Sequence, residues 1–215
     1  MWLQHVIQKL PEDNLIDLSV VIPTYNRCDS LRKTIQSLQD QTLDSTRFEV
    51  VIADDGSQDQ TAEVASESYP YNVQHHSQQN QGSAMARNLG AKFSQGEVLV
   101  YLDDDICVES KYLESVLRAH QKFDRAIIQG SLITVLPADP TPFQIIQAEI
   151  SDTSTLPGGQ SQKLTYQDCL SGFFTIQRPH YYEISEMQDV GGMDIPPGAI
   201  SIGVSDVRVP VLKSC

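Results

Sequence analysis

The chain has 215 residues, a formal net charge of −13, 40% hydrophobic residues and 20% charged residues. This length and composition are typical of one globular domain with a sizeable core and leave little room for a second. The acidic balance lacks the basic surface of a nucleic-acid-binding protein and would be repelled by an anionic membrane. No apolar stretch reaches the roughly 18 residues that a membrane-spanning helix needs, so we expect no transmembrane segment.

Short apolar runs alternate with amphipathic segments along most of the chain. Residues 18–22 are apolar on both faces, as in a central strand of a covered sheet, and residues 48–53 and 97–102 are also expected to be strands. Further strands are expected at 72–75, 126–135 and 169–176. Helices are expected at 31–38 with Asp29 or Ser30 as the cap, and at 61–65, 81–93, 112–123 and 142–150. The alternation predicts an α/β fold with a mostly parallel sheet flanked by helices.

Composition divides the chain into three parts. Residues 1–17 are polar and mixed and are interpreted as an N-terminal arm, whereas residues 18–135 carry the regular α/β pattern. Residues 136–215 change character, because prolines and a Gly158–Gly159 pair interrupt their first part.

The cysteines are Cys28, Cys107, Cys169 and Cys215, and no two of them form a C-x-x-C pair. This spacing argues against a zinc site or a disulfide framework. We therefore interpret all four as thiols in a reducing cytoplasm.

Polar clusters follow three of the expected strands, at 23–27, 54–57 and 103–105. In an open α/β sheet, ligands bind outside the carboxyl ends of the strands. One such cluster is readily explained as a turn, since Asp, Gly, Ser and Asn are turn residues. Three clusters at successive strand ends instead predict one ligand-binding crevice.

The run Asp103-Asp104-Asp105 carries the most specific chemistry. In an extended segment, residues i and i+2 point to the same side, so Asp103 and Asp105 can face one cation together. Hard carboxylate oxygens suit Mg²⁺ or Mn²⁺ bridging a diphosphate, and the alternative is a solvated acidic turn. The chain has neither G-x-G-x-x-G after the first strand nor a P-loop, so backbone N–H groups and Arg87 are expected to assist the metal with a diphosphate.

The order of these motifs resembles that of family 2 glycosyltransferases, which have the GT-A fold. The resemblance rests on residues 21–27, 54–57, 80–90 and 102–105, and it covers residues 18–135 well and 168–195 more loosely. It implies inverting transfer of a sugar from a nucleotide-diphospho-sugar to a hydroxyl of a carbohydrate, lipid or protein acceptor, with Mg²⁺ or Mn²⁺. It also implies work in the cytoplasm, at most peripheral to the inner membrane face.

The resemblance assigns roles to particular residues. The residues at 23–25 and Arg27 would line the base and ribose pocket, and Asp54 or Asp55, with Asp55 slightly favoured, would bind the nucleobase. Asp103 and Asp105 would hold the metal. The substrate-binding residues implied in this way are Pro23, Thr24, Tyr25, Arg27, Asp54, Asp55, Arg87, Asp103 and Asp104.

The last third of the chain resembles the family less closely. Residues 172–178 and 190–194 match a strand and a turn of the acceptor side, and Ser205-Asp206 stands where the family has Glu-Asp, which makes Asp206 the candidate general base. Pro210 follows closely and argues against a continuing helix. Residues 18–135 would then be the nucleotide-sugar-binding half and 136–215 an incomplete acceptor-side half.

Two alternatives to an active transferase follow from these departures. One is a catalytically weak or inactive nucleotide-sugar-binding module, a shortened member of the family. The other is a nucleotidyltransferase with a related sheet, which would need a Gly-rich basic loop after the first strand, and residues 25–29 are not such a loop.

The histidines are weaker candidates. His75 and His76 should face opposite sides of a strand, and His120 is expected to be exposed on a helix. His180 with Tyr181 and Tyr182 is interpreted as a packing group, with stacking on an acceptor sugar as the alternative.

Overall fold

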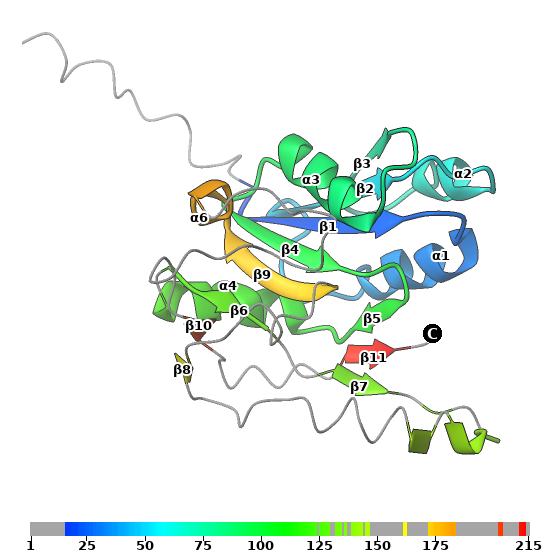
Figure 1. Cartoon of the computed structure of the whole chain (residues 1–215). Helices are drawn as coiled ribbons and strands as arrows, with labels where there is room; N and C mark the ends of the chain where they lie inside the picture. Colours follow the sequence, from blue (N-terminus) through cyan, green and yellow to red (C-terminus); the bar gives the residue numbers. More distant parts are fainter. Residues whose placement is uncertain are drawn as a thin grey trace, which may run out of the picture.

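The structure is a computed structural model that describes residues 16–123, 125–129, 132–134, 136, 139–143, 145–146, 161–162, 172–183, 202–203 and 211–213 (Figure 1). The predicted base Asp206 lies outside these residues, as does the 190–194 segment, so both assignments stay predictions.

A six-stranded sheet forms the centre of the described structure, in the order β3-β2-β1-β4-β9-β6. Its strands are β1 (Leu18–Thr24), β2 (Phe48–Asp54), β3 (Asn72–Ser77), β4 (Val98–Leu102), β6 (Ile127–Ile128) and β9 (Phe173–Gln177). β1 to β4 are parallel, whereas β9 runs antiparallel to both β4 and β6. The expected mostly parallel α/β sheet is therefore confirmed.

Two small sheets lie beside the central one. One is β5 (Ile106–Val108), β11 (Val211–Lys213) and β7 (Leu132–Thr134), and the other pairs β8 (Ser161–Gln162) with β10 (Ile202–Gly203). The single strand expected over 126–135 is wrong, because β6 and β7 belong to different sheets. The sequence between them, Gln129-Gly130-Ser131, breaks the apolar run.

Within the described ranges, the helices with defined bounds are α1 (Cys28–Ser37), α2 (Thr61–Ala65), α3 (Ser83–Phe93), α4 (Tyr112–Lys122) and α6 (Arg178–Glu183). The expected cap of α1 is wrong, since Arg27 occupies the N-cap position and makes no side-chain capping bond. Instead, the Cys28 N–H donates to the Asp59 carboxylate from the neighbouring loop at 2.9 Å. A distant acceptor thus replaces the local cap, and Asp29 falls inside the first turn.

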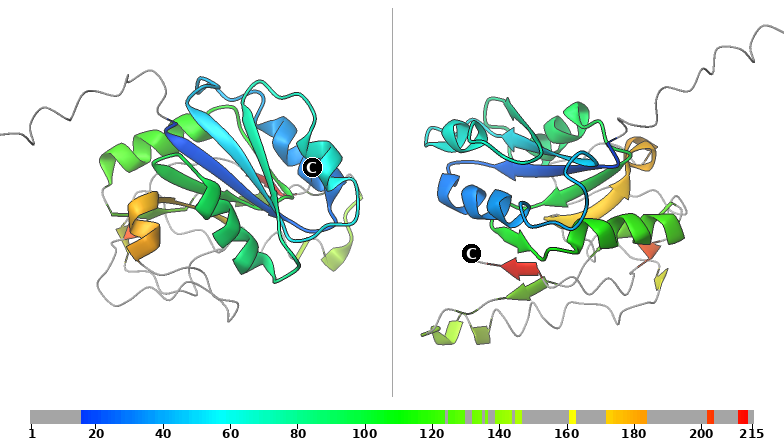
Figure 2. Two further views of the ribbon diagram at one scale, coloured as in Figure 1. Left: turned by 90° about the horizontal axis from the view of Figure 1, so that it is seen from above. Right: turned by 180° about the vertical axis from the view of Figure 1, so that it is seen from behind.

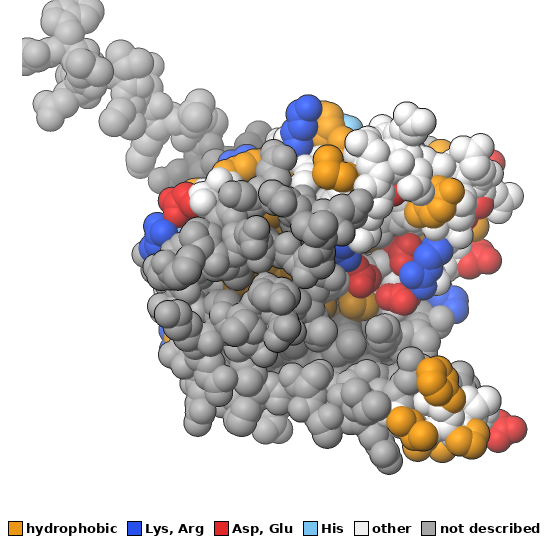
Figure 3. All heavy atoms as spheres, viewed as in Figure 1, with side chains coloured by type: hydrophobic (Ala, Val, Ile, Leu, Met, Phe, Trp, Pro, Cys, Tyr) orange, Lys and Arg blue, Asp and Glu red, His pale blue; other side chains and the backbone are white. Residues whose placement is uncertain are grey.

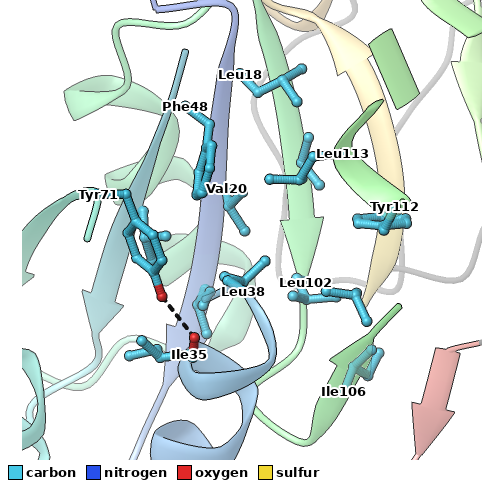
Figure 4. Close-up of a cluster of buried hydrophobic side chains, with 14 of the residues drawn as sticks. Leu18, Val20, Ile35, Leu38, Phe48, Tyr71, Leu102, Ile106, Tyr112 and Leu113 are labelled. Atoms are coloured by element: carbon cyan, nitrogen blue, oxygen red, sulfur yellow. Dashed lines mark hydrogen bonds between the residues drawn. The ribbon is translucent and has the colours of Figure 1, made fainter. Parts of the chain in front are cut away.

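Helices cover both faces of the sheet (Figure 2). Side chains alternate along each strand, so Leu18, Val20 and Ile22 of β1 join the cluster with residues of α1, α2 and α4. Figure 4 shows part of this cluster, including the Tyr71 hydroxyl that donates to the carbonyl oxygen of Ile35.

The opposite face of the sheet carries α3. Val21 belongs to the cluster on this face, and a Cβ at Gly90 would lie only 2.3 Å from Val21 Cγ1. The small residues expected in this helix therefore allow the close packing that seats α3, and with it Arg87, against β1 and β2.

Two findings bear on the surroundings of the protein. Among the helices of the described ranges, none combines the length and apolar character of a membrane-spanning segment. Cys28 is a free thiol but Cys107 is disulfide-bonded, so the expectation of four thiols is wrong. Sequence spacing does not reveal which cysteines meet in space, and the cysteines no longer argue for a reducing compartment.

Candidate functional site

The three polar clusters meet at the carboxyl ends of β1, β2 and β4. Thr24 and Asp54 are register partners at the ends of β1 and β2, and the Asp55 N–H donates to the Thr24 carbonyl oxygen at 2.9 Å. Beside the ends of these strands, acidic and basic side chains are gathered on one face of the molecule (Figure 3). The sheet topology therefore produces the single polar crevice expected from the sequence.

Asp104 is the buried centre of the acidic run, with a side chain only 5% exposed. Its Oδ2 accepts a hydrogen bond from Thr24 Oγ1 at 2.8 Å, and its Oδ1 lies 3.0 Å from Arg27 Nη1. Burial raises the pKa of Asp104 to about 6, against the opposing effects of the Thr24 hydrogen bond and the Arg27 charge. Asp104 thus links the first and fourth strands and anchors Arg27.

Asp103 and Asp105 flank this centre and are more exposed, with side-chain exposures of 37% and 25%. Each has its own arginine, since Arg87 Nη2 lies 2.6 Å from Asp103 Oδ1 and Arg27 Nη2 lies 3.0 Å from Asp105 Oδ2. Although burial alone would lower the pKa of Arg27, its hydrogen bond to Asp105 and the three aspartate charges raise it.

Arg87 is the more deeply held of the two arginines. Its side chain is 6% exposed, and its Nε has no hydrogen-bond partner within the described part of the chain. The Nε is itself closed to solvent, so what Arg87 brings to the acidic run is a buried positive charge.

The donor set suits a hard divalent cation. Asp103 and Asp105 offer carboxylate oxygens to solvent, while Asp104 is turned inward. Within the described residues, no three His, Cys, Asp or Glu side chains converge as a ready-made metal cage. Mg²⁺ usually keeps several waters and needs only one or two carboxylates together with substrate phosphates, so two carboxylates fit it.

Asp54 shapes the turn that follows β2. Its carboxylate accepts the Ser57 N–H at 2.8 Å and lies 3.2 Å from His75 Nε2. Gly56, which lies between Asp54 and Ser57 in the sequence, has a φ of +89°, a conformation that residues with an L side chain rarely adopt.

Asp55 holds the loop that leads into α3. Its Oδ1 accepts hydrogen bonds from Gln78 Nε2 and the Gln81 N–H, and its Oδ2 accepts one from the Gly82 N–H. Both Asp54 and Asp55 are 4% exposed, so at most a single edge of either carboxylate reaches the crevice.

The residues at 23–27 are placed unequally. Pro23 is buried inside β1, whereas Tyr25 is 45% exposed. Asn26 has a positive φ of 53°, and its backbone N–H and side-chain Oδ1 bond to Ser57 Oγ and the Gln58 N–H. The loop that carries Tyr25 and Arg27 is therefore fixed to the loop after β2.

Gly172 is a site residue that the sequence did not reveal as one. Its carbonyl oxygen accepts the Asp103 N–H at 2.9 Å, and a Cβ on it would lie 1.7 Å from Asp103 Oδ2. The only signal was a glycine just before an apolar strand, and nothing local indicated its neighbour 69 positions away in the chain.

His75, His76 and His120 have structural partners. His75 lies beside Asp54 while the His76 ring stacks on Phe93 at 3.6 Å, so the neighbours have separate partners as expected. His120 is 6% exposed, and the expectation of an exposed side chain is wrong because α4 packs this side on Thr175. Tyr181 is fully buried and its hydroxyl donates to Asn88, which favours packing over sugar stacking for this ring.

Solved structures with the same arrangement are GT-A glycosyltransferases. Staphylococcus aureus TarS in a UDP-GlcNAc complex matches 93% of this chain and 59% of its own, with a TM-score of 0.71 and 19% identity. The full TarS structure gives a TM-score of 0.70 over 93% of this chain and 37% of its own. At this identity the likeness establishes the GT-A fold.

Sequence relatives narrow the class further. Residues 19–185 match the family described as Glycosyl transferase family 2. A validoxylamine A glucosyltransferase of Streptomyces hygroscopicus is 42% identical over 130 residues, 58% of this chain and 31% of that protein. An uncharacterised glycosyltransferase of Haemophilus influenzae is 41% identical over 101 residues, 47% of this chain and 33% of that protein.

The chain belongs to glycosyl transferase family 2. It spans about a third of the length of these curated relatives. The resemblance inferred from the four motifs is confirmed.

Proposed function

We propose that the chain binds a nucleotide-diphospho-sugar with Mg²⁺ or Mn²⁺ and transfers the sugar to an acceptor hydroxyl with inversion. The observation that supports this most strongly is the pairing of the exposed Asp103 and Asp105 with two arginines beside the buried Asp104. Such a site can accept both a divalent cation and a diphosphate. A bound metal supplies Lewis-acid stabilisation of the leaving nucleoside diphosphate.

The chain's own residues would divide the remaining work. Arg87, a buried cation beside Asp103, would contact the diphosphate, and the exposed Tyr25 would cover the base. Asp54 and Asp55 fix the loops around the nucleoside, and Asp55 stays the favoured base-binding carboxylate. Asp206 is the proposed general base and would take the proton of the acceptor hydroxyl.

A uridine nucleotide is the first donor to test, because the matched TarS structures include UDP and UDP-GlcNAc complexes. The decisive measurement is calorimetry with UDP, GDP and dTDP, each with Mn²⁺ and with EDTA. We expect one nucleotide to bind, and to bind more tightly with Mn²⁺. If none of them binds under either condition, the proposed donor site is wrong.

The second candidate is a nucleotide-sugar-binding module without transfer, and it is carried by the departure from Glu-Asp at Ser205-Asp206. Phosphorus NMR of UDP-sugars incubated with Mg²⁺, where water stands in for the acceptor hydroxyl, separates the two functions. Release of UDP that Asp206→Asn abolishes supports the transferase, whereas tight binding without any release supports the binding module.

A further inference from the structure

Arg27 is unlike the other groups of the site, because a fixed backbone carries a half-exposed side chain. Both flanking residues are bonded to the loop after β2, Asn26 to Ser57 and Gln58 and Cys28 to Asp59. The Arg27 side chain is nevertheless 48% exposed. Any change in its contacts is therefore a rotation of the side chain and needs no movement of the loop.

The two ends of the Arg27 guanidinium have different partners. Nη1 contacts Asp104, which is buried and held by Thr24, whereas Nη2 contacts the more exposed Asp105. The contact with Asp104 is the anchored one, and the contact with Asp105 is the one that solvent and ions can reach. Asp105 is also one of the two carboxylates that suit the cation.

Charge balance supports an exchange at Asp105. Among the described residues, two guanidinium groups face three carboxylates, so this part of the site without a metal keeps one uncompensated negative charge. A divalent cation bound to Asp103 and Asp105 would place excess positive charge against Arg27, and like charges at such short range repel. The same excess attracts a diphosphate.

We propose that Arg27 is a resident counter-cation that a divalent metal displaces from Asp105, turning about Asp104 so that its free end faces the donor diphosphate. The inference rests on the proposed function. It makes Arg27 a competitor of the metal in the free protein and a ligand of the donor in the loaded protein. Removal of its charge should therefore change the two affinities in opposite directions.

The test has two measurements. Mn²⁺ binding to the full chain without nucleotide is measured by electron paramagnetic resonance of the free ion, and UDP binding at saturating Mn²⁺ is measured by calorimetry. Arg27→Met keeps the apolar stem and removes the charge. Arg32→Met is the matched control, because Arg32 lies on α1, the helix that Arg27 precedes, and pairs with Asp29 and Glu67 outside the site. It removes the same formal charge from the chain.

We expect Arg27→Met to bind Mn²⁺ roughly fivefold more tightly than Arg32→Met and to bind UDP roughly fivefold less tightly, since a half-exposed charged contact is worth about 1 kcal/mol. Arg27→Lys should fall between wild type and Arg27→Met, because one ammonium cannot bridge two carboxylates. It also serves as the second variant should Arg27→Met not fold, in which case it must still bind Mn²⁺ more tightly than wild type.

Three outcomes overturn the inference: unchanged Mn²⁺ affinity, weakening of both affinities together, or no Mn²⁺ binding by any variant. Weakening of both indicates a structural role for Arg27. Calorimetry with UDP, GDP and dTDP, each with Mn²⁺ and with EDTA, separates this failure from that of the proposed function. Nucleotide binding under either condition keeps the donor site, whereas its absence under both conditions removes both proposals.

Discussion

Two buried carboxylates, Glu49 at the amino end of the central strands and Asp104 at the carboxyl end, are held by different kinds of donor. At the amino end, the fully buried Glu49 accepts bonds from Ser19 Oγ at 2.6 Å, the Gln95 N–H at 2.7 Å and Gln74 Nε2 at 2.7 Å. At the carboxyl end, Asp104 is held by one hydroxyl and one half-exposed guanidinium. Glu49 and its neutral donors, which the fold holds in place, form a fixed contact that we call the permanent joint. Asp104 and its neighbours Asp103 and Asp105, whose partner Arg27 is half exposed, form a site that ligands can enter, which we call the exchangeable site.

The largest expected effect is at the permanent joint. Glu49→Ala leaves at least the Ser19 hydroxyl and the Gln95 N–H without their acceptor, so we expect the free energy of unfolding to fall by about 4 kcal/mol. Urea unfolding measures this loss, and Glu49→Gln should lose less because it keeps one acceptor. Nucleotide affinity of the folded fraction should not change. A stable Glu49→Ala protein with weakened nucleotide binding would contradict this prediction, because Glu49 would then serve ligand binding and not the stability of the fold.

A buried histidine adds a pH test of the structural groups. Burial, and then the charge of His180, lower the pKa of His120 from 6.5 to about 4. Its Nε2 lies 2.8 Å from Thr175 Oγ1, and that hydroxyl donates to the Ile128 carbonyl, which identifies Nε2 as the protonated nitrogen of the neutral ring. Because the folded pKa is lowered, the stability that the neutral ring allows is present above pH 6.5 and is lost as the pH falls toward 4.

The loss amounts to about 3 kcal/mol across this window, at about 1.4 kcal/mol per pKa unit. Unfolding of wild type and His120→Gln between pH 4 and 7 checks it, and the variant should lack this part of the slope. Equal slopes in the two proteins would contradict the shift. The experiment concerns the fold alone, since His120 lies outside the proposed site.

Asp104 should give the opposite slope. Its pKa is raised from 3.8 to about 6, so the folded protein holds the proton more tightly than the unfolded chain. Stability should therefore decrease as the pH rises from about 4 to 6, and Asp104→Asn should remove this decrease. If Asp104→Asn leaves the slope unchanged, the carboxylate is better compensated than its burial implies.

The sequence predicted the sheet and the acidic site better than it predicted the contacts between segments that are distant in the chain. Strand periodicity and the Asp runs are local signals, so β1, β2, β4 and Asp103 to Asp105 were found from them. The roles of Glu49, Gly172 and His120 depend on contacts between distant segments, such as Glu49 with Gln95 and Asp103 with Gly172. Periodicity carries no information on such contacts, which also explains the wrong cap of α1.

At the exchangeable site, the clearest single change is Asp105→Ala. It removes one of the two exposed carboxylates that face the cation, so we expect Mn²⁺-dependent nucleotide affinity to fall about 100-fold, or about 2.7 kcal/mol. Asp29→Ala is the matched control, because the Asp29 side chain is 93% exposed on α1 and lies outside the acidic run. The thermal stability of Asp105→Ala should stay close to that of wild type. Unchanged Mn²⁺-dependent nucleotide affinity in this variant would refute the metal role of Asp105.

The smallest expected effect is that of an alanine substitution at one glycine from each end of the sheet. A Cβ at Gly172 would meet the Asp103 carboxylate at 1.7 Å, whereas a Cβ at Gly96 would meet the backbone of Leu18 and Ser19 at 2.6 Å. The side chain of Asp103 can turn away but a strand backbone cannot. Gly172→Ala should therefore weaken Mn²⁺ binding about tenfold with little change in stability, and Gly96→Ala should destabilise the fold and spare the site.

Mn²⁺ titration and urea unfolding of both variants complete this test. If Gly172→Ala unfolds the protein as readily as Gly96→Ala, then the Asp103 carboxylate is as rigid as the backbone at the amino end. In that case the contrast between a permanent joint and an exchangeable site does not extend to Asp103. A selective loss of metal affinity would instead show that the contact of Asp103 with Gly172 sets the position of the carboxylate for its ligand.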